Sequence, residues 1–286
     1  MTTSLRLGLS PCPNDTFILH ALLHGLVDTH GVRIEPVLAD VEELNALLAA
    51  GGIEATKASF AAFARHRARW AALRTGGALG RGNGPLVVAR DPLAPGDLAG
   101  RRVLLPGDLT TAALLFRTFH PDVTDTPCLR YDRLPGALAR GEADAAVIIH
   151  ELRFTYRERG LHAVEDLGAR FEAETGLPVA LGGIFVRRDV DASLAAALEG
   201  WVGQSLAIAR RDPALSRDFV RAHAQELAEG VTRAHIDLYV NEFSAGYGEL
   251  GTRAIEALLA RAVAAGAAPA CDAPLYVPAR DDAGET

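Results

Sequence analysis

The sequence predicts an α/β protein with two lobes. Short apolar segments alternate with periodic segments of about 10 to 15 residues, which is the pattern of parallel β–α–β units. A glycine-rich stretch at residues 76–84 separates two such series, and only helical patterns follow residue 187. The length of 286 residues also favours two domains, because a domain commonly contains roughly 150 residues.

The first series of elements ends near residue 69. Apolar runs in it predict strands, and apolar residues at helical spacing predict the helices between them. The expected strands are 5–10, 32–38 and 53–57, and the expected helices are 16–26, 41–50 and 60–69. Asn14 and Asp15 precede the first of these helices, where either side chain can cap it.

The second series begins after the glycine-rich stretch. Its expected strands are 85–90, 102–105, 128–131, 145–149 and 181–187, and its expected helices are 111–120, 134–140 and a short one after residue 150. The chain is then expected to be helical to about residue 265, with helix boundaries near Asp191, Asp212 and Gly230. The acidic tail at 281–286 is expected to fray.

The chain is predicted to change lobe at two strands. It enters the second lobe near Leu86 and leaves it near Phe185, which assigns residues 88–186 to lobe two and residues 1–87 with 187–286 to lobe one. Two crossover strands between α/β lobes are typical of the periplasmic-binding-protein-like (type II) fold. We therefore expect a ligand cleft between the lobes, with the C-terminal helices completing lobe one.

Charge and composition exclude several classes of protein. The net charge of −7 and the lack of a basic run disfavour a nucleic-acid binder. No run of 18 uncharged apolar residues is present, so no membrane span is expected. The three cysteines form no C-x-x-C pair, and the N-terminus lacks the basic and apolar regions of a signal peptide. These features predict a cytoplasmic protein with free thiols.

The loops that follow the strands are the candidate sites, because ligands of open α/β sheets bind outside the carboxyl ends of the strands. The first such loop contains Ser10, Cys12, Asn14 and Asp15, with a proline on each side of the cysteine. This arrangement is more specialised than a helix cap requires, which favours a function in the cleft. An ordinary helix cap is the alternative.

Lys57 is the only lysine among 29 basic residues. Arginine occupies every other basic position, so this one is a candidate for needing a compact ammonium group. Beside Ser59, at the start of the next helix, the ammonium would form an anion site. A lysine placed there by chance, or one on the surface, is the alternative.

Two further loops carry candidate groups. Thr110 and Thr111 open a helix, where hydroxyl and backbone N–H groups can hold a carboxylate or phosphate, or simply cap the helix. His150 ends an apolar strand, where a neutral imidazole is a suitable base near pH 7; a structural histidine is the alternative. His20 and His24 lie one helical turn apart with no third ligand evident, so no metal site is expected.

Taken together, these loops resemble the 1,4-dihydroxy-6-naphthoate synthase family of the futalosine route to menaquinone. The resemblance extends over about residues 5–277. The matching segments are SPCPNDTF, TKASF, GGALGRGNGPLVVAR, TTA, RYDR, IIHELRFTY, TGLPVALG, HAQEL and YVNEFS. Leu152 stands where the family usually has serine, a change that we expect to be tolerated.

The resemblance implies a two-lobed lyase with its site in the cleft. The family splits cyclic dehypoxanthinylfutalosine, a small carboxylate, into 1,4-dihydroxy-6-naphthoate and dihydroxyacetone. It implies that His150 is the base, and no redox cofactor is expected because aromatisation drives the cleavage. A nearby Lys57 would keep His150 neutral, because a like charge disfavours imidazolium.

The resemblance also implies the substrate contacts. It assigns Lys57, Ala58 and Ser59 on lobe one, and Thr110 with Thr111 on lobe two. The loop with Ser10, Asn14 and Asp15 is a possible further wall of the cleft, and its cysteine has no assigned role. Chorismate dehydratase of the same pathway is an alternative, which the SPCPNDTF loop disfavours. The second alternative is a non-catalytic solute-binding protein, and the missing signal peptide disfavours it.

Overall fold

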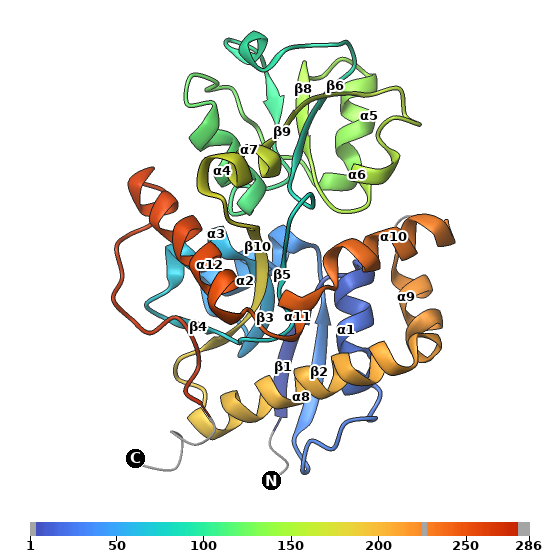
Figure 1. Ribbon diagram of the computed structural model, residues 1–286, viewed down its shortest axis with the longest axis vertical. Helices are drawn as coiled ribbons and strands as arrows, with labels where there is room; N and C mark the ends of the chain where they lie inside the picture. The colour runs from blue at the N-terminus through green and yellow to red at the C-terminus, as the bar shows by residue number, and fades with distance from the viewer. Residues whose placement is uncertain (1–3, 225–227, 280–286) are drawn as a thin grey trace.

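Two β-sheets, each flanked by helices, make up the computed structural model, which describes residues 4–224 and 228–279 (Figure 1). The strand order of the larger sheet is β2-β1-β3-β10-β4, with β5 paired to β10. The strand order of the smaller sheet is β7-β8-β6-β9. The predicted tail at 281–286 lies outside the described residues.

The larger sheet is mixed. Its strands are β1 (Ser4–Leu9), β2 (Arg33–Leu38), β3 (Ala55–Ser59), β4 (Trp70–Ala72), β5 (Ala78–Gly80) and β10 (Val179–Arg187). The first three are parallel, with α1 (Pro13–Leu23), α2 (Val41–Ala50) and α3 (Phe60–His66) following them in turn. The long strand β10 runs antiparallel to β3, β4 and β5. The predicted β–α–β units are therefore present, but they are completed by an antiparallel strand.

The smaller sheet is also mixed. Its strands are β6 (Leu86–Ala89), β7 (Val103–Leu104), β8 (Ala145–Ile148) and β9 (His162–Asp166). Only β7 and β8 are parallel, and β6 runs antiparallel to both β8 and β9. Its helices are α4 (Thr111–Phe119), α5 (Leu134–Ala139), α6 (Leu152–Thr155) and α7 (Leu167–Thr175), with 3₁₀ turns η1 (Pro95–Leu98) and η2 (Tyr131–Arg133).

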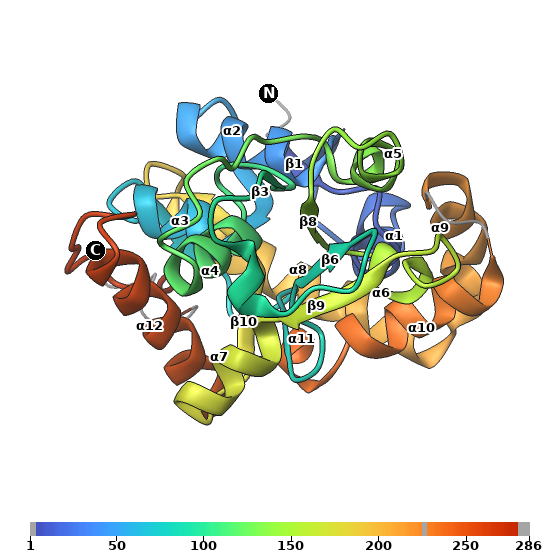
Figure 2. The same ribbon diagram turned by 90° about the horizontal axis from the view of Figure 1, so that it is seen from above.

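The C-terminal helices pack around the larger sheet, as Figures 1 and 2 show. They are α8 (Ala192–Arg211), the 3₁₀ turn η3 (Pro213–Ser216), α9 (Arg217–His223), α10 (Glu229–Tyr239), α11 (Glu242–Ala245) and α12 (Gly248–Ala264). The Ser205 hydroxyl joins α8 to α1, because it accepts from Leu22 N (3.0 Å) and donates to Ile18 O (2.6 Å). The prediction that the chain is helical to about residue 265 is confirmed for the described residues, which leave out 225–227.

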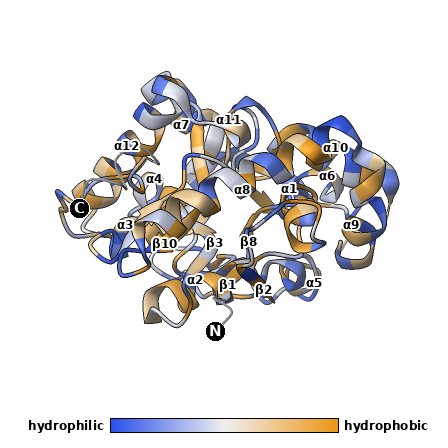
Figure 3. Cartoon of the chain, turned by 90° about the horizontal axis from the view of Figure 1, so that it is seen from below, coloured by the Kyte–Doolittle hydropathy of each residue, from blue (hydrophilic) through white to orange (hydrophobic). Residues whose placement is uncertain are grey.

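Apolar residues fill the space between the sheets and their helices. Figure 3 shows orange residues along β10 and blue residues on outer turns of α7 and α10. Phe63 and Phe185 stack in the core at a ring-centroid distance of 4.5 Å, and Phe60 meets Phe185 edge to face at 5.3 Å. These contacts join α3 to β10 and so fix the wall from which Lys57 and Ser59 project.

Three differences from the sequence prediction bear on the site. Helix α1 begins at Pro13, with Cys12 at its N-cap, so Asn14 and Asp15 lie inside its first turn and cap nothing. The segment predicted as a strand at 128–131 forms only a single bridge, between Leu105 and Cys128, before turning into η2. Strands β4, β5 and β9 and helix α7 were not predicted, since none carries a long apolar run.

The crossovers between the sheets lie near the predicted places. Strand β6 pairs within the smaller sheet, and β10 pairs within the larger one. The exact division into lobes at 87/88 and 186/187 stays a prediction. No helix in the described part of the chain is long and apolar enough to cross a membrane.

Candidate active site

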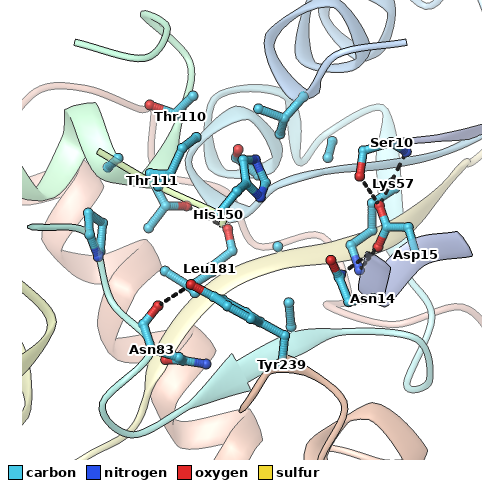
Figure 4. A pocket seen from close by; sticks show the side chains of 18 of the residues that line it. Ser10, Asn14, Asp15, Lys57, Asn83, Thr110, Thr111, His150, Leu181 and Tyr239 are labelled. Carbon is cyan, nitrogen blue, oxygen red and sulfur yellow. Dashed lines mark hydrogen bonds and ion pairs between the residues drawn. The ribbon is translucent and has the colours of Figure 1, made fainter. Parts of the chain in front are cut away.

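A cavity lies between the two sheets and is lined from both (Figure 4). Nine of the candidate residues named from the sequence border it. These residues are Ser10, Asn14, Asp15, Lys57, Ala58, Ser59, Thr110, Thr111 and His150. The remaining lining residues include Asn83 and Tyr239, which the sequence did not single out, and apolar side chains such as Ile149 and Leu181. The structure thus brings the four predicted loops together, while the role of each residue stays a prediction.

Lys57 forms a buried ion pair at one side of the cavity. It stands in the middle of β3, rather than at the end of a strand as predicted, and its residue is 6% exposed. Its Nζ lies 2.9 Å from Asp15 Oδ1 and donates to Gly76 O at 2.8 Å. The surface-lysine alternative is therefore wrong. Because Asp15 compensates the charge, the ammonium is not an open anion site of its own.

The Asp15 carboxylate is held by more than the lysine. Its Oδ2 accepts from the hydroxyl (2.7 Å) and the backbone N–H (3.2 Å) of Ser10. Its Oδ1 also accepts from Asn14 Nδ2 at 2.8 Å. Figure 4 shows these groups gathered on the side of the cavity away from Thr110 and Thr111. A buried charge needs this number of partners, because an unpaired one would be very costly.

His150 follows β8 and lies between the two groups of polar residues (Figure 4). Its backbone has a left-handed φ of 56°, which is uncommon outside glycine and often marks a functional position. Its Nδ1 lies 3.4 Å from Cys12 Sγ, and the Tyr131 ring meets it edge on at 4.9 Å between centroids. Its Nε2 is buried and has no hydrogen-bond partner among the described residues.

Burial keeps this imidazole neutral. Loss of hydration lowers the pKa of His150 from its ordinary value to about 4. The negative charge of Asp15 opposes this shift, and the positive charge of Lys57 adds to it by less. Lys57 therefore acts in the predicted direction, but desolvation is the largest cause of the neutral ring and Asp15 outweighs Lys57. A neutral ring is what proton abstraction by a histidine requires.

The starts of two helices meet at the other side of the cavity. Thr110 caps α4, since its hydroxyl accepts from Ala113 N at 3.1 Å and donates to Gly107 O at 2.9 Å. The Thr111 hydroxyl donates to Leu181 O at 2.8 Å and accepts from Ala61 N, of α3, at 3.3 Å. Both hydroxyls are thus already engaged, which differs from the predicted direct contacts to an anion.

Other donors at this side are available to a ligand. Ser59 is the N-cap residue of α3 but makes no side-chain cap bond, and its hydroxyl accepts from Asn45 Nδ2 at 3.2 Å. The hydroxyl hydrogen of Ser59 has no acceptor among the described residues. Within the same part of the chain, the N–H groups of Thr111 and Ala112 make no hydrogen bond either. A helix start with free N–H groups attracts an anion.

Sequence reasoning missed a second histidine beside the first. His235 of α10 is fully buried, and its ring lies 6.4 Å from that of His150 and 4.4 Å from that of Tyr239. Its Nε2 donates to Asn14 Oδ1 at 2.9 Å, and burial holds the pKa of His235 well below its ordinary value. The Tyr239 hydroxyl donates to Asn83 O at 3.1 Å. The family motif around Tyr239 marks this part of the chain, but a helical pattern does not reveal which face meets the site.

Cys12, His150 and Glu151 form the one group in the described part of the chain whose residue types and spacing suit a metal ion. Their ligand atoms lie within 4.8 Å of one another. The distance of 3.4 Å between Cys12 Sγ and His150 Nδ1 also fits a hydrogen bond with no metal ion between them. The rings of His20 and His24 stack with their centroids 4.3 Å apart, and His24 Nδ1 forms a hydrogen bond with His20 O. These contacts are those of two histidines that pack against each other on α1.

Comparisons with known proteins agree with these features. A protein family described as menaquinone biosynthesis matches residues 5–264. A 1,4-dihydroxy-6-naphthoate synthase of Thermus thermophilus is 50% identical over 274 residues, covering 96% of this chain and 99% of its own. An enzyme of the same name from Streptomyces coelicolor is 42% identical over 272 residues, covering 93% and 95%.

Solved structures show the same fold. A protein of Archaeoglobus fulgidus aligns with a TM-score of 0.87 and 30% identity, over 92% of this chain and 98% of its own. The periplasmic aliphatic sulphonate binding protein of Escherichia coli aligns with a TM-score of 0.66 and 14% identity, over 94% and 90%. The predicted periplasmic-binding-protein-like fold is confirmed.

Proposed function

The chain belongs to the menaquinone-biosynthesis family and is an enzyme, and from this premise we propose that it is a lyase acting on cyclic dehypoxanthinylfutalosine. Its products would be 1,4-dihydroxy-6-naphthoate and dihydroxyacetone. The observation that carries the proposal is a neutral, unpartnered histidine nitrogen at the wall of a cavity between two sheets, namely Nε2 of His150.

His150 starts the reaction in this proposal. Its Nε2 takes a proton from a carbon of the saturated substrate ring. The electron pair left on that carbon drives the breaking of the bond to the sugar-derived fragment, and the ring becomes aromatic. The fragment leaves with the electrons of the broken bond and takes up the proton held by His150. No electrons are gained or lost overall, so the chain's own residues have only to bind the substrate and move a proton. The neutral state of His150 and the burial of its Nε2 support this role.

The aromatic carboxylate of the substrate is assigned to the side with the two helix starts. The free N–H groups of Thr111 and Ala112, together with the Ser59 hydroxyl, are the donors that suit it. Thr110 would act by fixing the start of α4, because its hydroxyl already serves as the cap. Binding would therefore depend on backbone N–H groups of α4, with the positive end of the helix adding to the attraction.

The sugar-derived fragment is assigned to the opposite side. There Lys57, Asp15, Asn14 and Ser10 offer both donors and acceptors, which suits hydroxyl groups. The positive charge of Lys57 favours the neutral form of the base, but desolvation is the main cause of that form and Asp15 opposes it. With these assignments, the substrate would lie across the cavity with its reacting carbon near His150, which stands between the two sides.

One assay tests the proposal. The purified protein is mixed with the cyclic substrate, without added cofactor, and the absorbance of the naphthoate product is followed. We expect turnover, and a loss of roughly 10²–10⁴-fold in kcat for His150→Asn, with a much smaller change in KM. Chorismate, offered separately, should remain unchanged. Tight binding of the cyclic compound without product would show a binding protein instead, and near wild-type kcat in His150→Asn would place the base elsewhere.

A further inference from the structure

Cys12 occupies a position that the capping of α1 does not explain. It is the N-cap residue of α1, where serine, threonine, asparagine and aspartate are preferred because their side chains bond to the first N–H groups. The Cys12 side chain makes no such bond. Its sulfur instead lies 3.4 Å from Nδ1 of His150, which is 138 residues away in the sequence.

The backbone around Cys12 holds the sulfur in one place. Pro11 and Pro13 flank the residue, and each has a restricted φ. The Cys12 carbonyl accepts from the N–H groups of Asp15 and Thr16, both at 3.1 Å, and from the Thr16 hydroxyl at 3.0 Å. The side chain is 2% exposed. The thiol is therefore a fixed reference point against which another side chain can be oriented.

The partner of this thiol comes from the other sheet. Cys12 follows β1 of the larger sheet, whereas His150 follows β8 of the smaller one. His150 has a left-handed backbone, and Tyr131 contacts its ring edge on. Of the two ring nitrogens, Nδ1 has the sulfur as partner, and Nε2 has none among the described residues.

We propose that Cys12 is a positioning residue for His150: its sulfur accepts the Nδ1 hydrogen, which leaves Nε2 without a hydrogen and able to accept the substrate proton. The hydrogen bond of one ring nitrogen decides the state of the other, so the contact selects the basic tautomer at Nε2. This inference rests on the proposed function, in which His150 is the base. When Nε2 takes the proton, the ring becomes positive and the Nδ1–H bond to sulfur strengthens.

The surroundings of Cys12 argue against a nucleophilic role. Burial, followed by the negative charge of Glu151, raises the pKa of the thiol well above its ordinary value. The sulfur therefore keeps its hydrogen near neutral pH, whereas a nucleophilic cysteine needs a lowered pKa. Cys12 thus acts through His150 and forms no bond to the substrate.

Kinetics of two variants test the inference. Cys12→Ala removes the acceptor and should lower kcat by about 10²-fold at most, with KM nearly unchanged, because a misplaced group loses rate rather than binding. Cys12→Ser keeps a polar atom, although a shorter one, and should recover part of the loss. If Cys12 merely filled space, Cys12→Ala would instead keep a higher kcat than Cys12→Ser. Cys128→Ala, at an exposed cysteine, is the matched control and should leave kcat unchanged.

Nitrogen-15 spectra of the histidine rings supply a second readout that does not depend on turnover. In the wild-type protein, we expect His150 to carry its hydrogen on Nδ1, with Nε2 bare. Cys12→Ala should shift the ring toward a mixture of tautomers. A wild-type hydrogen on Nε2, or an unchanged kcat in Cys12→Ala, would overturn the inference.

The two proposals fail in distinguishable ways. If the wild-type protein turns over the substrate and Cys12→Ala does so equally well, only the inference about Cys12 is lost. If the wild-type protein makes no naphthoate, the proposed function is lost, and the spectra still show whether sulfur sets the tautomer of His150. Should Cys12→Ala not fold, the wild-type spectrum and Cys12→Ser decide the question.

Discussion

Removing the ammonium of Lys57 should destabilise the protein by several kcal/mol. We consider Lys57→Met, which keeps much of the side-chain volume in β3 and deletes only the charge. The Asp15 carboxylate, 3% exposed, would lose the partner at 2.9 Å and keep only the hydrogen bonds from Ser10 and Asn14. Breaking a buried ion pair by removing one member typically costs about 3–5 kcal/mol.

Thermal unfolding measures this cost. At roughly 2 °C per kcal/mol, the value near this chain length, the expected fall in Tm is about 6–10 °C. Adding Asp15→Asn to Lys57→Met should restore part of the stability, because no uncompensated charge then remains. Arg33→Lys, at an exposed position, is the control and should change stability by less than about 0.5 kcal/mol. A Tm within about 2 °C of wild type in Lys57→Met would refute the reasoning.

Lys57→Arg separates charge from shape. The arginine keeps the positive charge, but Lys57 is buried in the middle of β3, with its Nζ held by Asp15 at 2.9 Å and Gly76 O at 2.8 Å. Adding atoms to a filled, buried strand costs about 1–3 kcal/mol. We therefore expect Lys57→Arg to be more stable than Lys57→Met yet to lose much of the activity. Full activity would show that the single lysine is an accident of composition.

Three further outcomes can be checked. The pKa of His150 is about 4 in the folded protein, and its neutral form is the base. The value of kcat/KM should therefore stay level from about pH 7 to pH 5 and fall as the pH drops through 4. A fall centred near the ordinary pKa of 6.5 would contradict the burial argument. The charged and titratable groups that face this ring are Asp15, Lys57, Cys12, Glu151, Tyr131 and His235. Gly107→Ala should lower the free energy of unfolding by about 1–3 kcal/mol, because the added Cβ would lie 2.5 Å from the Glu42 carboxylate. That carboxylate accepts a hydrogen bond from Leu109 N, which the clash would disturb. An unchanged Tm in thermal unfolding would contradict this prediction. Ligand contacts on both sheets should favour a closed state, so small-angle scattering should give a smaller radius of gyration with a product analogue than without it, and equal values would count against closure.

Apolar strands in the middle of a sheet were the predictable part of the fold. The segments LVVA of β6 and AAVI of β8 are buried throughout, and their composition alone indicates strands. The edge strand β9 escaped prediction because its sequence, HAVED, is polar and half exposed. The prediction of a strand at 128–131 was wrong in the opposite sense. Its sequence resembles a strand, but only Cys128 forms a β-bridge, with Leu105.

The site was predictable as a set of loops but not as a set of contacts. Topology places the segments after neighbouring strands at one edge of a sheet, so Thr110 and His150 were expected together, and the predicted cleft between the lobes placed Lys57 opposite them. Their partners depend on packing between segments far apart in the sequence. The pair of His235 and Asn14, for example, is separated by 221 residues, and no local pattern reveals it. For the same reason, the sequence identified Asp15 and Lys57 separately without predicting their ion pair.

The segment 10–16, which runs into the first turn of α1, is held by such distant contacts. Within it, Cys12 contacts Nδ1 of His150 and Asn14 accepts from Nε2 of His235. The rings of the two histidines lie nearly parallel, so a movement of the loop would disturb both at once. A helix cap alone needs one suitable side chain and tolerates motion around it. A segment that sets the hydrogen positions of two imidazoles does not tolerate it, and this accounts for a proline on each side of Cys12.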